Sequence, residues 1–195
     1  MRTFATALVL VFLTCAATQA SILTYGSPLT GSAESPPTGS PGTGSVSVVI
    51  DTTANTLFIS ASFAGLEAGS TASHIHCCTT STGTGNANVA TQIPTFTNMP
   101  LGVTSGSFTQ TLDLTQASSY NPAFITANGG TATTAEAALL SGIAAGDSYY
   151  NIHTTMFPSG EIRGYLTPTA IPEPGTWVFT AAVLLGIALR RRWRD

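Results

Sequence analysis

The chain has 195 residues, of which 43% are hydrophobic and only 8% are charged, and it contains no lysine. Between Ser21 and Ala170 a single arginine stands against seven acidic residues, which gives this section a net charge of −6 with histidine neutral. Such an acidic surface repels phosphate backbones and argues against nucleic acids as partners. Abundant glycine, serine, threonine and valine are typical of strands joined by tight turns, so we expect an all-β domain with one short helix.

The first 20 residues have the organisation of a secretion signal. Arg2 supplies a positive start, Ala7–Leu13 an apolar run, and Thr18–Ala20 a small-x-small cleavage site. Lipoprotein processing at Cys15 is the alternative, but the residues before this cysteine suit that processing poorly. We therefore predict export from the cytoplasm and cleavage after Ala20.

Alternating apolar residues predict an antiparallel hairpin in the first half of the domain. The segment Val46–Asp51 places three aliphatic side chains on one face, and Thr56–Phe63 alternates in the same way. Thr52–Asn55 forms the turn between them. A third alternating run covers Ser105–Leu114, so we expect several strands to share one core.

One helix is predicted over residues 135–140, where the sequence is Ala-Glu-Ala-Ala-Leu-Leu. Thr133 or Thr134 can cap its first turn, and Gly142 is suited to end it.

A closing hairpin is predicted from Tyr149–Thr154 and Glu161–Leu166, with its turn at Pro158–Gly160. Several short strands with glycine-rich turns favour an antiparallel, Greek-key-like β-sandwich or a small barrel.

The three histidines have the spacing of a metal site. His74 and His76 are two residues apart on a predicted strand, so their side chains share a face and Ile75 points the other way. Asn151 and His153 have the same relation in the closing hairpin. A His-x-His pair with a distant histidine suits zinc or copper, and the alternative is that these imidazoles only make structural hydrogen bonds.

A short internal echo relates the two histidine segments. Residues 65–76 and 142–153 are identical at five of twelve positions, and each copy ends in Ile-His. The echo predicts that His76 and His153 occupy equivalent strand positions in two similar halves.

Cys77 and Cys78 are the only cysteines after the predicted cleavage site. Adjacent Cα atoms lie about 3.8 Å apart, which is closer than in most disulfides. A vicinal bridge, an intermolecular bridge, free thiols and soft metal ligands all remain open, and an oxidising compartment favours a bridge.

No catalytic motif is present, so we expect a protein that is not an enzyme. Glu161 and Arg163 lie two residues apart and are interpreted as a structural ion pair.

Three segments carry a family resemblance: Leu29–Asp51 with its Glu-x-Pro-Pro, Ser73–Thr79 with its His-x-His, and Tyr149–Leu166 with its Asn-x-His-Thr and Gly-Glu-Ile-Arg-Gly. Over about residues 27–168 the chain resembles the CHRD, or chordin-type, domain. Relatives commonly have Gly-Pro where this chain has Cys77-Cys78. The resemblance implies a β-rich extracellular domain and no assigned reaction.

The C-terminus combines a rigid tripeptide, a short apolar run and an arginine cluster. The apolar run Trp177–Leu189 has 13 residues, fewer than the roughly 20 that span a bilayer as a helix. The residues that define this tail are Pro172, Glu173, Pro174, Arg190, Arg191 and Arg192. The tail resembles a PEP-CTERM sorting signal, which implies recognition by an exosortase-type enzyme in a Gram-negative bacterium that makes exopolysaccharide. A plain membrane anchor is the alternative.

The predicted organisation has four parts: a signal peptide over residues 1–20, a linker over 21–28, a β domain over 29–168 and a sorting tail over 169–195. We expect a structural or binding protein of the cell envelope, outer surface or extracellular matrix, held briefly at the inner membrane by its tail. Extracellular polysaccharide or other surface proteins are the expected partners. The alternative function is copper or zinc binding by His74, His76 and His153.

Overall fold

The computed structural model describes residues 22–169. In chain order its strands are β1 (Ile22–Thr30), β2 (Thr43–Asp51), β3 (Thr56–Ala64), β4 (Ser70–His76), β5 (Gly106–Asp113), β6 (Tyr149–Thr154), β7 (Ile162–Tyr165) and β8 (Thr167–Pro168). Its helices are α1 (Pro122–Ala127) and α2 (Ala132–Ala145), with short 3-10 turns at Gly31–Ala33 and Ala117–Ser119.

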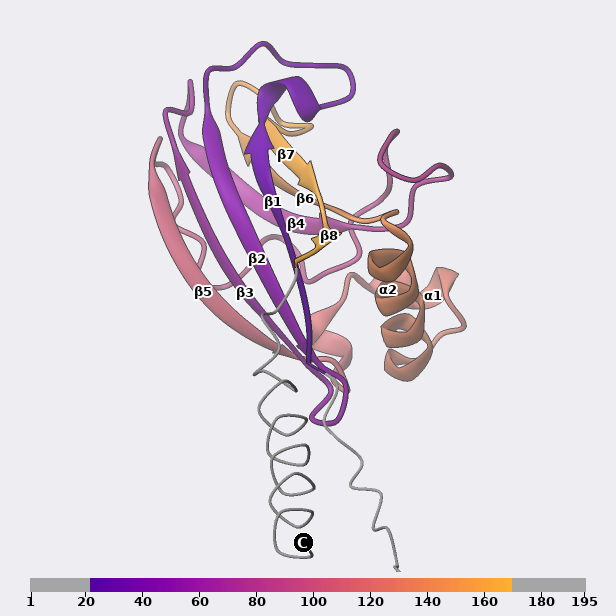
Figure 1. Cartoon of the computed structure of the whole chain (residues 1–195). Coiled ribbons are helices and arrows are strands. Elements are labelled where there is room, and N and C mark those ends of the chain that lie inside the picture. Colours follow the sequence, from indigo (N-terminus) through magenta and orange to yellow (C-terminus); the bar gives the residue numbers. More distant parts are fainter. Residues whose placement is uncertain (1–21, 170–195) are drawn as a thin grey trace, which may run out of the picture.

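The strands form one curled antiparallel sheet. Seven strands follow the order β4-β6-β7-β1-β2-β3-β5, and β8 pairs with β1. The sheet curls into a half-barrel with two walls, one made of β1, β2, β3 and β5 and the other of β4, β6 and β7 (Figure 1). The predicted fold class, mainly β and antiparallel, is confirmed.

The predicted hairpin in the first half is confirmed. β2 and β3 pair in continuous register from Thr43↔Ala64 to Asp51↔Thr56, so the predicted four-residue turn joins them. Asn55 ends this turn with φ of 51°, a backbone conformation that asparagine adopts more readily than most residues. The aliphatic face of each strand is buried in the core, as alternation requires.

The other two predicted strand regions are also confirmed. The alternating run Ser105–Leu114 contains β5, which pairs with β3 along its whole length. β6 and β7 pair antiparallel up to Ile152↔Ile162, with the turn where it was predicted.

Two predictions about local structure were wrong. The linker expected over residues 21–28 is replaced by β1, which pairs with β2 over nine residues. Gly26 and Pro28 weaken the strand pattern there, and the pairing with β2 overrides that weak local preference. Proline is tolerated in a strand where its missing N–H is not needed.

The helical region is larger than predicted. α2 begins after Thr131, whose side chain accepts a hydrogen bond from the backbone N–H of Thr134, and it ends at Gly146 in the left-handed conformation. Thr133 and Thr134, the two expected caps, and Gly142, the expected end, all lie inside the helix. The six-residue α1 was not predicted, and Asn121 caps it.

The space between the two walls holds the hydrophobic core. β2 and β3 contribute fully buried residues such as Val48 and Ile59, and the opposite wall contributes Ile75, Tyr150 and Ile152. α2 packs onto the same core through Leu139 and Ile143, among others. The wall of β4, β6 and β7 therefore has one apolar face, and its other face is free to carry polar groups.

The signal peptide and the sorting tail both lie outside the described residues, with the tail's defining residues among 170–195. Within residues 22–169, no helix is long and apolar enough to cross a membrane.

Candidate metal centre

The three histidines lie together on the polar face of the β4–β6–β7 wall. In β4, Ile75 enters the core, so the pleat turns His74 and His76 to the opposite face. β6 is the antiparallel neighbour, with Asn151 opposite His74 and His153 opposite Ala72. Sheet register thus joins residues that are almost 80 positions apart in sequence.

The imidazoles form a compact cluster. One ring nitrogen from each histidine lies within 4.8 Å of the other two. His74 Nδ1 and His153 Nε2 are 3.3 Å apart, and the ring centroids of His76 and His153 are 5.6 Å apart. All three side chains are buried, with at most 9% of each residue exposed.

A backbone carbonyl fixes the tautomer of each ring. The carbonyl oxygens are Pro94 for His74 Nε2 (2.8 Å), Ala87 for His76 Nδ1 (2.9 Å) and Pro158 for His153 Nδ1 (2.9 Å). A carbonyl can only accept, so each of these nitrogens carries the proton. In a neutral ring the other nitrogen then has a free lone pair. Those other nitrogens are His74 Nδ1, His76 Nε2 and His153 Nε2.

Burial keeps the rings neutral. The pKa of His74 and of His76 is lowered from 6.5 to about 4, mainly by desolvation and in smaller part by the neighbouring histidines. The pKa of His153 is lowered by the same desolvation. Near neutral pH, His74 Nδ1 and His153 Nε2 therefore face each other with no proton to share, and His76 Nε2 is buried with no hydrogen-bond partner.

This arrangement fits a transition-metal ion. Metal-bound histidines commonly donate their second ring N–H to a backbone carbonyl, as all three do here. Three nitrogens bound to one ion at about 2.1 Å lie about 3.5 Å from one another, so nitrogens 4.8 Å apart would need to approach by about 1 Å to share that ion. Three nitrogen donors are the ligand type that copper and zinc accept.

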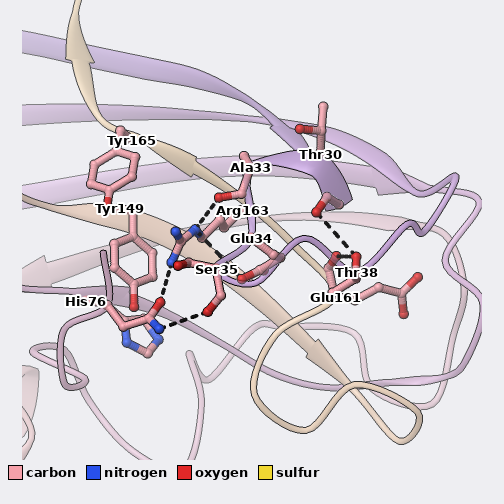
Figure 2. A network of polar contacts seen from close by, with 12 residues as sticks. Thr30, Ala33, Glu34, Ser35, Thr38, His76, Tyr149, Glu161, Arg163 and Tyr165 are labelled. Atoms are coloured by element: carbon pink, nitrogen blue, oxygen red, sulfur yellow. Dashed lines mark hydrogen bonds and ion pairs between the residues drawn. The ribbon is translucent and has the colours of Figure 1, made fainter. Parts of the chain in front are cut away.

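A second set of buried polar groups lies beside the cluster on the same face (Figure 2). The Tyr149 ring stacks on His76 with a centroid distance of 4.7 Å, and the guanidinium carbon of Arg163 lies 4.5 Å from the Tyr149 centroid. Arg163 donates hydrogen bonds to the Ala33 carbonyl and to Asn86 Oδ1. These contacts hold the His76 side of the cluster in place.

The prediction of an ion pair between Glu161 and Arg163 was wrong. Arg163 instead has its Nε 3.7 Å from Glu34 Oε2, and both side chains are buried. Glu161 accepts hydrogen bonds from Ser40 Oγ and Thr154 Oγ1. Glu161 precedes β7 rather than lying in it, so the two-residue alternation that suggested the pair does not apply.

Desolvation raises the pKa of Glu34 from 4.5 to about 7, and the nearby Arg163 opposes this rise. Glu34 Oε1 is buried without a hydrogen-bond partner.

A pocket of about 590 Å³ opens beside the cluster. The loop around Glu34, the turn Met156–Gly160 and His76 contribute to its walls. This volume lies within the range of small-molecule sites.

Cys77 and Cys78 are joined by a disulfide. Their sulfur atoms lie near the Ala138 carbonyl and against Gly142 of α2. The sulfur atoms are therefore directed at the helix, and among the described residues only histidines form the cluster.

The internal echo does not correspond to two similar halves. Gly65 lies in a loop with φ of 70°, whereas Gly142 lies inside α2. The strands that follow are antiparallel neighbours, so His76 pairs with Tyr149 and His153 pairs with Ala72. The two histidines meet through this pairing rather than by occupying equivalent positions.

Comparison with known families decides the classification. The model of the CHRD domain matches residues 25–166, which is most of the chain. The chain belongs to the CHRD domain family. No curated protein and no solved structure matches it. CHRD domains are typically extracellular or secreted, which agrees with an exported protein.

Several groups at the site of this CHRD domain were not predicted from the sequence. Asn86 lies in no local pattern that marks it, and Tyr149 was seen only as part of a predicted strand. The roles of the Ala87, Pro94 and Pro158 carbonyls cannot be read from a sequence. Glu34 stands in the Glu-x-Pro-Pro segment that suggested the family, and this was the one available signal for it.

Proposed function

We propose that this protein is an exported surface protein whose CHRD domain binds a transition-metal ion through His74, His76 and His153. The observation that carries the proposal is the arrangement of the free lone pairs. Three buried imidazoles are each fixed by a carbonyl; His74 Nδ1 and His153 Nε2 face each other at 3.3 Å, one ring nitrogen of His76 lies within 4.8 Å of a nitrogen of each, and His76 Nε2 has no hydrogen-bond partner. Purely structural histidines would be expected to use these nitrogens in hydrogen bonds.

Metal titration of the purified protein tests this proposal. We expect one zinc or copper ion per chain and a rise in melting temperature that a chelator reverses, because a ligand that binds only the folded state stabilises it. His76→Phe keeps a ring to stack on Tyr149 but removes the donor nitrogen, so it should abolish binding. Thr133→Ala, an exposed change on α2, is the matched control and should bind normally.

Two results would contradict the metal proposal: an unchanged melting temperature with all zinc and copper salts, or equal binding by His76→Phe and the unmodified protein. Far-ultraviolet circular dichroism of the variant shows whether it has kept the fold.

We further propose that the C-terminal tail is a sorting signal processed by an exosortase-type enzyme, which delivers the domain to the surface or extracellular matrix of a Gram-negative bacterium. The order Pro-Glu-Pro, short apolar run and arginine cluster supports this proposal. At the surface, the acidic domain would serve in a structural or binding role, with extracellular polysaccharide or surface proteins as partners.

The mass of the native protein tests the sorting proposal. We expect the surface form to lack the residues after Pro174. A surface form that still contains Trp193 would identify the tail as a plain membrane anchor. Deleting Arg190–Arg192 should leave the protein unprocessed, whereas Thr133→Ala should be processed normally.

A further inference from the structure

The donor set of the histidine cluster is made of neutral nitrogen atoms only. Among the described residues, no carboxylate or thiol joins the three imidazoles. The two buried carboxylates of the described residues have other partners: Glu34 lies beside Arg163, and Glu161 accepts hydrogen bonds from Ser40, Thr154 and the backbone N–H of Glu67. The cysteine sulfurs are bonded to each other beside α2. An ion bound here therefore keeps its full positive charge.

Burial makes the size of that charge important. The cost of moving an ion out of water grows with the square of its charge, so a divalent ion costs about four times as much as a monovalent ion of the same size. All three histidines are at least nine-tenths buried. The only described arginine, Arg163, is also close, stacked on the tyrosine that stacks on His76. These surroundings favour a single positive charge.

The number of donors points the same way. Zinc is almost always four-coordinate in proteins, and divalent copper prefers a tetragonal arrangement. The pocket beside the cluster reaches His76, but His76 Nε2 itself is buried, so the protein does not present this nitrogen to a water that could serve as a fourth ligand. Monovalent copper has a filled d shell and accepts three ligands without a fourth.

We propose that the ion held by His74, His76 and His153 is monovalent copper, bound by three nitrogens. This inference rests on the proposed metal-binding function and specifies the ion. In a trigonal arrangement the nitrogens lie about 3.5 Å apart, so the 3.3 Å between His74 Nδ1 and His153 Nε2 already suits it, and nitrogens up to 4.8 Å apart would move inward by about 1 Å. The carbonyl-bound N–H groups hold the rings in the orientation that this arrangement needs.

The test measures metal preference in the full chain under anaerobic conditions. Monovalent copper, kept reduced with ascorbate, is offered in competition with a chromophoric chelator, and zinc and divalent copper are titrated in parallel. We expect one monovalent copper ion per chain, bound at least about tenfold more tightly than zinc. X-ray absorption of the copper-loaded protein should show three nitrogen neighbours and no sulfur.

The double variant Cys77→Ser/Cys78→Ser removes any contribution from thiols and should keep the same affinity, whereas His76→Phe should lose it. Tighter binding of zinc, or a four-coordinate copper spectrum, would overturn this inference and leave the metal-binding function standing. Failure to bind any of the three ions would overturn both the choice of monovalent copper and the proposed metal-binding function. The absorption measurement uses unmodified protein, so it does not depend on the folding of a variant.

Discussion

Burial lowers the pKa of His74 and His76 and raises the pKa of Glu34, so these groups affect the pH dependence of stability in opposite directions. For His74 and His76 the folded pKa of about 4 lies below the ordinary 6.5, so the unfolded chain binds protons more readily between these values. Their contribution to stability is present above pH 6.5 and is lost as the pH falls toward 4. For Glu34 the folded pKa of about 7 lies above 4.5, so its contribution grows as the pH falls from 7 to 4.5.

We therefore predict that the metal-free protein loses stability on acidification from pH 6.5 to 4. Each of the two histidines contributes a loss of up to about 3 kcal/mol, while the single Glu34 opposes it with a gain of similar size. Glu34→Gln removes the opposing contribution, so the variant should lose stability more steeply over the same range. Urea unfolding at several pH values, in the presence of a chelator, measures both slopes. A stability that stays constant or rises toward pH 4 would contradict the prediction.

At the level of single residues, the sequence predicted which side chains share a strand face, but it could not predict which backbone carbonyls contact them. Two-residue spacing was enough to place His74 and His76 on one face, because the strand period is fixed by covalent geometry. It could not supply the carbonyls that fix each ring, since every residue carries a carbonyl. Arg163 was assigned to Glu161 from sequence proximity, but the chain brings Glu34 to it from 129 residues away.

Among the elements, α2 and the end of β4 are fitted together at one glycine. A Cβ atom on Gly142 would overlap the sulfur atoms of both Cys77 and Cys78. The helix can therefore approach the disulfide this closely only because this position has no side chain.

We predict that Gly142→Ala destabilises the protein by about 1–3 kcal/mol through overpacking. This sign is opposite to the usual effect in a helix, where alanine is favoured over glycine by about 1 kcal/mol. Ser141→Ala, at the exposed neighbouring position, is the matched control and should change stability by less than about 0.5 kcal/mol. Urea unfolding measures both variants.

The cause can be isolated by repeating the change in a Cys77→Ala/Cys78→Ala background. Without the sulfur atoms the loss caused by Gly142→Ala should largely disappear. An equal loss in both backgrounds would show that the disulfide is not what excludes the side chain.

The elements that sequence patterns predicted best are those with local partners. The β2–β3 and β6–β7 hairpins were predicted with their turns because alternation and turn residues act over a few positions. β1 was missed because its strand character comes from pairing with β2, not from its own pattern. The limits of α2 were misplaced because several threonines could cap it, and only the structure selects Thr131.

In the molecule as a whole, the two faces of the β4–β6–β7 wall have different roles. One face closes the hydrophobic core, and the other carries the polar layer with the histidine cluster (Figures 1 and 2). That the sheet is antiparallel followed from the sequence. That β7 joins β1 and so curls one wall over the other did not, because this pairing links residues 133 positions apart.

The histidine cluster is one of the attachments of the long loops that cover the polar face. The loop between β4 and β5 supplies the carbonyls of Ala87 and Pro94 to two histidines, and the turn after β6 supplies that of Pro158 to the third. Ala90, Phe96 and Met99 of the β4–β5 loop enter the core, but the exposed parts of a loop open locally at lower free energy than core strands. An ion that fixes the imidazoles should therefore also hold these covering loops.

We predict that metal loading protects these loops from proteolysis. Ile93 and Met156 are 52% and 57% exposed, which makes them accessible sites for a broad-specificity protease such as subtilisin. Cleavage near Ile93 and near Met156 should slow several-fold in the copper-loaded protein. Cleavage requires local opening of the loop, and the bound ion opposes that opening. Phe58 is also partly exposed, but it lies within β3 between two paired strands and should resist cleavage in either form. Mass spectrometry of timed digests locates the cuts.

His76→Phe should show the same cleavage rates with and without copper, and protection of that variant would mean that the effect does not come from the histidine cluster.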